Sequence, residues 1–124
     1  MVLPNIFLLV VAVWPASAQT PAVSARGLTS GEAIFHAGCA GCHGSTGAGA
    51  PETSTMFDRP ATFPDFTDCP TTTPELDVDW KATITQGGHG RGFSPIMPSF
   101  AVELTPAQVD AVIGYLRTLC KSNR

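Results

Sequence analysis

Positive charge is scarce in this sequence, which excludes a strongly basic nucleic-acid-binding surface. The 124 residues contain seven Lys and Arg against ten Asp and Glu, giving a formal net charge of −3 at pH 7. Every charged residue follows position 18, so removal of an N-terminal segment would leave this balance unchanged. Proteins that bind nucleic acid instead gather Lys and Arg on one face. A nucleic-acid partner is therefore not expected.

The chain also lacks an apolar run that is long enough to cross a membrane. Ile6–Trp14 is about half the ~20 residues that a spanning helix needs. Such a run followed by Ala16-Ser17-Ala18 is typical of a secretory signal peptide, although no Lys or Arg precedes it. We predict a signal peptide at 1–18, a flexible leader at 19–27 and one folded domain at 28–124. The mature chain is then periplasmic or otherwise exported and has no membrane span.

The sequence also contains few stretches of aliphatic residues from which a core made of protein alone could form. Only three stretches are rich in aliphatic residues, and the chain carries 12 Gly and 11 Pro. About a hundred residues remain after the signal peptide, which suits one compact domain. Because a thin core does little to offset the loss of conformational entropy, we expect a large buried cofactor to complete the interior.

Local patterns predict three helices, separated by loops rich in Gly and Pro. The first covers 32–38 after a cap at Thr29 or Ser30. The second runs from 75 or 77 to 86 and ends at a glycine pair, and the third follows a Thr-Pro start and runs to about Cys120. The third has a buried stripe at i, i+3, i+4, i+7 spacing: Val109, Val112, Ile113, Leu116 and Cys120.

The stretch from Gly44 to Pro74 has no helical period and is predicted to be an ordered loop. Loops of this length are uncommon unless they wrap something. No stretch shows the alternation of a β-strand, and the chain has no internal repeat. The predicted fold class is therefore all-α, with a few short helices and long loops.

The sequence Cys39-Ala40-Gly41-Cys42-His43 is the pattern for covalent haem attachment. Two thiols three positions apart on a helical turn can each add to one vinyl group of the same haem. The residue that follows then places its imidazole under the iron. We predict haem c, bound through Cys39 and Cys42, with His43 as the proximal iron ligand.

Two other sites use similar residues. A thioredoxin-like dithiol needs a βαβ context, and no strand is predicted before Cys39. A structural zinc ion would need Cys42 and His43 to reach one small tetrahedral centre, which is difficult for adjacent residues.

An electron-transfer haem also needs a second axial ligand. Met97 lies 54 residues beyond His43, between Ile96 and Pro98, where an irregular loop can cross the opposite haem face. Met56 follows the motif too closely to round the haem edge, so packing is its expected role. His89, in a glycine-rich loop, is the rival ligand, and His36 is expected at the surface. A methionine that simply fills a gap in the core is the alternative for Met97.

Cys69 and Cys120 remain once the two thiols of the motif are assigned to haem. A disulfide is the usual state of such a pair in an exported protein. It would close a loop of about fifty residues and contribute roughly 4 kcal/mol in the chain-entropy model. The alternative is two buried free thiols.

From about Leu28 to Cys120 the chain resembles the class I cytochrome c family, most specifically in its haem motif and the glycines that follow it: Gly44, Gly47 and Gly49. In that family a proline after the motif lends its carbonyl to the proximal histidine ring, and Pro51 matches that place. Trp80 resembles the aromatic residue that hydrogen-bonds a haem propionate, with plain core packing as the alternative. The segment that begins at Met97 resembles the family's distal-methionine segment.

The resemblance further implies that the first and last helices pack across each other. Gly31 or Gly38, with Phe35, would then meet Tyr115 and its neighbour Leu116. Two features depart from the usual small carriers. One is the Cys69/Cys120 pair, and the other is the Thr-, Pro- and Asp-rich segment from Phe63 to Pro74, for which the resemblance suggests no role.

We therefore predict a small cytochrome c fold wrapped around one covalent haem, acting as an electron carrier and not as an enzyme. Its expected partners are redox proteins such as a dehydrogenase, an oxidase or another cytochrome, presenting positive charge. One alternative is a haem subunit of a larger exported oxidoreductase. Another is a haem enzyme or gas sensor with an open sixth position, for which His89 and Arg91 are the available distal groups.

Overall fold

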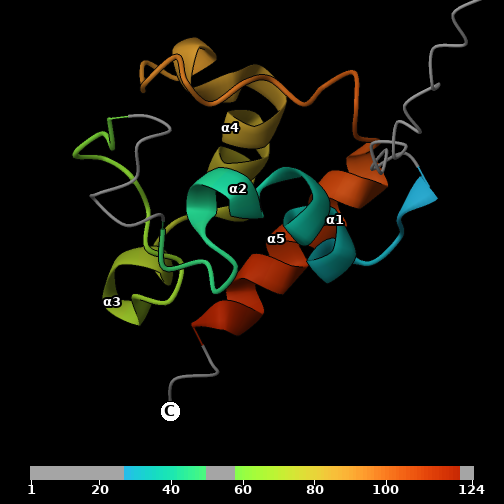
Figure 1. The fold of residues 1–124 in the computed structure, drawn as a ribbon, viewed down its shortest axis with the longest axis horizontal. Coiled ribbons are helices and arrows are strands. Elements are labelled where there is room, and N and C mark those ends of the chain that lie inside the picture. Colours follow the sequence, from blue (N-terminus) through green and yellow to red (C-terminus); the bar gives the residue numbers. More distant parts are fainter. Residues whose placement is uncertain (1–26, 50–57, 121–124) are drawn as a thin grey trace, which may run out of the picture.

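Helices joined by loops and turns make up the described structure (Figure 1). The computed structural model describes residues 27–49 and 58–120, and it has no β-strand within these ranges. Its helices are α1 (Gly31–Gly38), α2 (Ala40–His43), α3 (Cys69–Thr72), α4 (Asp77–Gly90) and α5 (Pro106–Leu119). The all-α prediction is confirmed. The proposed signal peptide and almost all of the proposed leader lie outside the described residues.

The ends of α1 and α5 follow from capping residues. The Ser30 hydroxyl accepts a hydrogen bond from the Ala33 N–H at 3.1 Å, and α1 begins one residue earlier than predicted. At α5 the Gln108 N–H donates to the Thr105 hydroxyl at 3.3 Å, and the Thr105 N–H donates to the Gln108 side-chain oxygen at 2.9 Å. This capping box fixes Pro106 at the first helical position, as predicted. Neither helix is long and apolar enough to span a membrane, and the same holds for every other helix in the described ranges.

The first and last helices pack across each other (Figure 1), as the resemblance implies. A Cβ atom on Gly31 would lie 1.9 Å from the Ala111 carbonyl oxygen, so the two backbones approach more closely than any other residue allows. The rings of Phe35 and Tyr115 pack beside this contact, with centroids 5.4 Å apart. Gly31 is therefore the glycine at which α1 and α5 cross. A Cβ atom on Gly38 would approach only one aromatic ring atom, at 3.9 Å.

The apolar core is small, as its supply of aliphatic residues predicts. Ten buried apolar side chains form it in the described residues: Ile34, Phe35, Phe66, Ile84, Leu104, Val109, Val112, Ile113, Leu116 and Leu119. The predicted α5 stripe is buried except at Cys120, which is half-buried at the end of the helix. Trp80, Met97 and Phe100 are partly buried against the same core.

The second predicted helix is longer than expected and is broken in the middle. We predicted an end at Gln86, whereas α4 continues to Gly90. Gly87 has φ 72° and ψ 173°, a conformation that favours glycine, and it separates the main part of α4 from one further turn. The break is thus at the predicted glycine pair, but the predicted end is wrong because the chain resumes helical geometry after the kink.

The predicted loop from 44 to 74 contains one helical turn, which is a second correction. The Thr72 and Thr73 N–H groups donate to the Asp68 and Cys69 carbonyls at 2.9 Å each, and this closes α3. The Thr72 hydroxyl donates to the same Asp68 carbonyl at 2.8 Å. A helix of four residues is too short to show a period in the sequence, which is why pattern analysis missed it.

Candidate functional site

The haem-attachment motif forms a helical turn directly after α1. Cys39 ends α1, and its carbonyl accepts the N–H groups of Cys42 and His43 at 3.1 and 3.0 Å. Residues three apart on such a turn lie on one face. The turn therefore brings Cys39 and Cys42 to the same side, as two thioether bonds to one porphyrin require.

The chain folds back over His43 immediately after the motif. Gly44 has φ 75°, and a Cβ atom there would lie 2.8 Å from the Gly49 carbonyl oxygen. The Gly49 N–H donates to the His43 carbonyl at 2.8 Å. The glycines that follow the motif thus close a tight loop around the backbone of the candidate iron ligand.

Cys39 does not have the lowered thiol pKa of a reactive dithiol. Cys39 and Cys42 are half-buried and are not bonded to each other. Burial, with a smaller contribution from the neighbouring Cys42, raises the pKa of Cys39 to about 11. Thiol–disulfide catalysis depends on a lowered thiol pKa, so the thioredoxin-like alternative gains no support. The zinc alternative gains none either, since no cluster of three or more potential metal ligands occurs in ranges 27–49 and 58–120.

The His43 side chain is half-buried. Burial lowers the pKa of His43 to about 4, which keeps the imidazole neutral at pH 7, the form that binds a metal ion. Its Nδ1 atom is buried and has no hydrogen-bond partner among the described residues. Pro51, the candidate acceptor for the ring N–H, lies outside those residues. A histidine that binds a metal through one ring nitrogen usually donates the N–H of the other nitrogen to an acceptor, and Nδ1 is the atom for which Pro51 is the candidate acceptor.

Two aromatic side chains contact the His43 ring. Phe63 is stacked on it, with ring centroids 4.8 Å apart and an interplanar angle of 21°. Phe66 lies 5.1 Å away at an angle of 38°. Both come from the 63–74 segment for which the sequence suggested no role. Pattern analysis missed these contacts, because aromatic residues in an aperiodic loop give no indication of what they touch.

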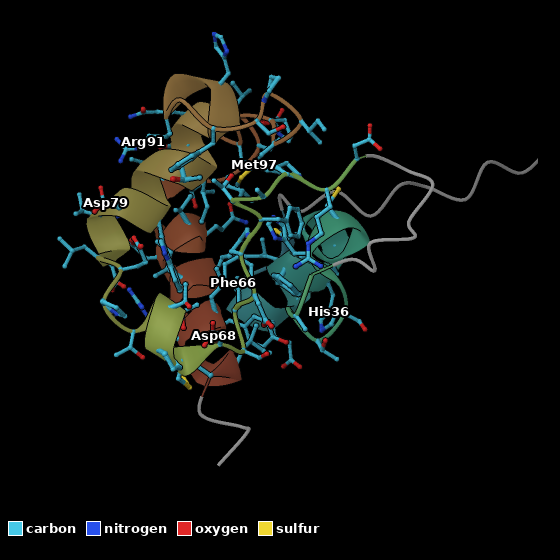
Figure 2. All side chains as sticks on the ribbon, turned by 90° about the vertical axis from the view of Figure 1, so that its left-hand side faces the viewer. His36, Phe66, Asp68, Asp79, Arg91 and Met97 are labelled. Carbon is cyan, nitrogen blue, oxygen red and sulfur yellow. A yellow bond between two sulfur atoms is a disulfide. The ribbon has the colours of Figure 1, made fainter. Side chains whose placement is uncertain are left out.

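Met97 lies on the loop that connects α4 to α5, half-buried against the core (Figure 2). Its carbonyl accepts the Gly88 N–H at 3.0 Å. A Cβ atom on Gly88 would lie 2.0 Å from the Ser94 carbonyl oxygen, so the start of this loop is pressed against the α4 backbone. The glycine pair that breaks α4 therefore also fixes the segment that carries Met97.

The rival ligands lie elsewhere. His89 is exposed on the last turn of α4, and His36 is exposed on α1, as predicted for His36. Figure 2 shows His36 and Met97 on different parts of the molecule. Arg91 is paired with Asp79, with 3.0 Å between the guanidinium nitrogen and the carboxylate oxygen. Met56 lies outside the described residues.

Trp80, on α4, connects the core to a charged side chain at its edge. Its ring meets the Phe66 ring edge-on, with centroids 5.7 Å apart. The Arg117 guanidinium carbon lies 4.0 Å from the centroid of the Trp80 ring. Arg117 was not among the predicted site residues, since nothing in the sequence of α5 indicates that it reaches α4.

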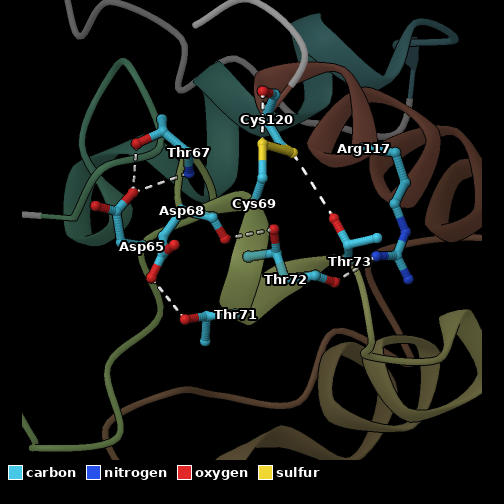
Figure 3. The surroundings of a disulfide bond; sticks show 9 residues. All are labelled: Asp65, Thr67, Asp68, Cys69, Thr71, Thr72, Thr73, Arg117 and Cys120. Atoms are coloured by element: carbon cyan, nitrogen blue, oxygen red, sulfur yellow. Dashed lines mark hydrogen bonds between the residues drawn. A yellow bond between two sulfur atoms is a disulfide. The ribbon is translucent and has the colours of Figure 1, made fainter. Parts of the chain in front are cut away.

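Cys69 and Cys120 are joined by a disulfide in the structure, with their Cα atoms 5.1 Å apart (Figure 3). The bond ties α3 to the end of α5. Arg117 adds a second tie nearby, since one of its terminal nitrogens donates to the Thr72 carbonyl at 2.7 Å. The segment that carries Phe63 and Phe66 is thus fixed to α5 at its far end.

These features fit a haem. The motif places two thiols on one face of a turn, and the adjoining imidazole has a buried nitrogen without a partner among the described residues. A Cβ atom on Gly41 would have no neighbour within 4 Å, so open space lies beside the middle of the motif. A sequence model of the cytochrome c family matches residues 28–120.

The chain belongs to the cytochrome c family. No curated protein and no solved structure matches it significantly. Membership confirms the predicted fold and cofactor: a cytochrome c binds haem c covalently, with its iron, and uses it for electron transfer. The family match covers three quarters of this cytochrome c, from just before α1 to the end of α5.

Proposed function

We propose that this cytochrome c is an exported monohaem electron carrier, with haem attached to Cys39 and Cys42 and with His43 and Met97 as the iron ligands. The observation that carries the proposal is His43. It directly follows two thiols on one helical turn, its half-buried imidazole is neutral at pH 7, and its buried Nδ1 atom has no partner among the described residues. The bound haem supplies a one-electron iron couple.

Met97 is the proposed sixth ligand because it is half-buried where the α4–α5 loop meets the core. A thioether ligand favours ferrous iron and raises the reduction potential. The Gly88 N–H holds the Met97 carbonyl, so the protein fixes the loop independently of any iron bond. His89, the rival, is exposed on the last turn of α4.

Export is proposed from two features. The N-terminal sequence has the apolar run and small-residue cleavage pattern of a signal peptide. The Cys69–Cys120 disulfide is of the kind that persists in oxidising compartments such as the periplasm. Redox proteins that present positive charge are the proposed partners, in keeping with the net charge of −3.

The first experiment tests attachment and export together. The full chain is expressed in a bacterium with a periplasmic haem-attachment system, and the purified protein is analysed by pyridine haemochrome spectroscopy and by intact mass. We expect one haem c per chain and a polypeptide that begins at Gln19. A colourless, folded protein with the mass of the bare polypeptide would contradict the proposal.

The second experiment tests the sixth ligand. Met97→Ala is expected to abolish the thioether-to-iron charge-transfer band of the ferric protein and to let the ferrous protein bind carbon monoxide. His89→Ala and Met56→Ala serve as matched controls and are expected to keep the band. Survival of the band in Met97→Ala would exclude Met97 as the ligand, and its loss in Met56→Ala would assign that role to Met56.

A further inference from the structure

The 63–74 segment is one of the features in which this chain differs from the usual small carriers. The proposed function does not explain it. The structure places two of its aromatic side chains against His43. Phe63 stacks nearly parallel to the imidazole at 4.8 Å, and Phe66 contacts the ring at 5.1 Å with a larger tilt. Offset stacking of this kind is a favourable arrangement for aromatic rings.

Phe66 is fixed from several directions. Its side chain is 8% exposed and belongs to the core, and its N–H donates to the Gly47 carbonyl at 2.9 Å. A Cβ atom on Gly47 would lie 2.5 Å from a Leu119 methyl carbon and 3.5 Å from the Phe66 Cβ. Phe66 is therefore locked between the loop that follows the haem motif and the last turn of α5.

Phe63 is fixed by its own turn and by charge. Its N–H donates to the Pro60 carbonyl at 3.0 Å. The Arg59 guanidinium carbon lies 5.4 Å from the centroid of the Phe63 ring. A Cβ atom on Gly49 would come within 3.3 Å of the same ring. The Phe63 ring thus lies against His43, Arg59 and the glycine loop.

The remainder of the segment is anchored as well (Figure 3). The Asp65 carboxylate accepts the Thr67 N–H at 2.8 Å and the Thr67 hydroxyl at 2.6 Å, which closes a turn directly around Phe66. Beyond that turn, the Cys69–Cys120 disulfide ties the segment to α5. These contacts make Phe63 and Phe66 a rigid support for the His43 ring.

We propose that Phe63 and Phe66 are positioning residues that set the rotational orientation of the His43 imidazole about its bond to iron. The inference rests on the proposed function, because the orientation has meaning only when His43 is a ligand. A single iron–nitrogen bond does not fix the plane of the ring, so neighbouring groups must do so. The flat face of Phe63 opposes rotation because any turn of the imidazole would break the stack.

The orientation of an axial imidazole has a direct spectroscopic signature. In low-spin ferric haem the unpaired electron occupies an iron orbital whose direction follows the planes of the axial ligands. The largest g value in electron paramagnetic resonance and the pattern of the four haem-methyl proton shifts in NMR therefore report the ring angle. A residue with a merely structural role changes stability and leaves both unchanged.

The test compares Phe63→Leu, which keeps an apolar side chain but removes the stack, with Phe63→Tyr, which keeps the ring. Phe93→Leu is the matched control, because Phe93 is 51% exposed on the α4–α5 loop. All variants are prepared as haem-loaded, oxidised full chains. We expect Phe63→Leu to shift the largest g value and to change the order or spread of the methyl shifts. Phe63→Tyr and Phe93→Leu are expected to match the wild type.

Unchanged signals in a haem-loaded Phe63→Leu protein would overturn the inference and leave the proposed function intact. A wild-type protein without covalent haem, or with haem that His43 does not ligate, would overturn both. Should Phe63→Leu fail to fold, the diamagnetic ferrous wild type decides the question. Nuclear Overhauser contacts between the Phe63 ring protons and the His43 imidazole protons support the inference, and their absence overturns it.

Discussion

Arg117 joins three parts of the molecule through one side chain. Its guanidinium donates to the carbonyls of Thr72 and Glu75, pairs with the Asp77 carboxylate at 2.7 Å and covers the Trp80 ring. Only a planar group with several N–H donors serves so many acceptors at once. Arg117 therefore holds α3 and the start of α4 against α5.

Substitution of Arg117 by Lys tests this account at the residue scale. The charge is kept, but the fork of donors and the flat stacking surface are lost, so we expect the free energy of unfolding to fall by about 1–3 kcal/mol. The control is Lys81→Gln, since the Lys81–Asp110 pair is close at 2.5 Å but its side chains are 44% and 58% exposed. Exposed pairs contribute about 0–1 kcal/mol. Denaturant titration of both oxidised variants gives the comparison, and equal losses would refute the special role of Arg117.

The residues that would bind haem could be predicted from the sequence. The aromatic side chains that pack against them could not. Cys39, Cys42 and His43 are adjacent in the chain, and the spacing of the motif is itself the geometric requirement for haem attachment. Phe63 and Phe66 reach His43 across twenty or more positions. Such a contact depends on where a loop is anchored, and no local pattern encodes that.

At the scale of elements, the helices whose bounds could be predicted are those that begin with a side-chain cap. The helices α1 and α5 have side-chain caps at their starts, and their bounds were predicted to within one residue. The end of α4 was not predicted, because Gly87 interrupts a helix that tertiary contacts then allow to continue. The glycine pair is typical of a helix end. In the structure, the same pair packs against the loop that carries Met97.

Replacement of Gly88 by Ala tests the junction between α4 and this loop. The new Cβ would lie 2.0 Å from the Ser94 carbonyl oxygen, so the loop must shift, at a cost of about 1–3 kcal/mol in unfolding free energy. We also expect a weaker thioether-to-iron band in the ferric spectrum. Gly114→Ala on α5 is the control, because nothing lies within 4 Å of that Cβ and Ala favours a helix by about 1 kcal/mol. A Gly88→Ala protein with unchanged stability and spectrum would show that close packing here does not position Met97.

At the scale of the whole molecule, the Cys69–Cys120 disulfide links residues that are 51 positions apart. A cross-link over so long a loop acts mainly by restricting the unfolded chain. The double variant Cys69→Ser/Cys120→Ser is therefore expected to lose about 2–4 kcal/mol of unfolding free energy while keeping its haem. Denaturant midpoints of the haem-loaded variant and of the oxidised wild type measure the loss. Equal midpoints would show that the cross-link has no effect on the stability of this protein.

We expect haem to complete the interior beside this small core, so a variant without haem is the most severe test of the fold. Ten buried apolar side chains form the core of the described residues, a small apolar contribution to set against the conformational entropy of this part of the chain. The variant Cys39→Ser/Cys42→Ser lacks the two proposed attachment thiols, and we expect it to lose haem, cooperative thermal unfolding and most of its near-ultraviolet circular dichroism. The disulfide is expected not to rescue it, because a cross-link lowers the entropy of the unfolded chain without filling a cavity. A sharp unfolding transition in this variant, with or without reductant, would mean that the polypeptide completes its own core and that the fold does not depend on haem.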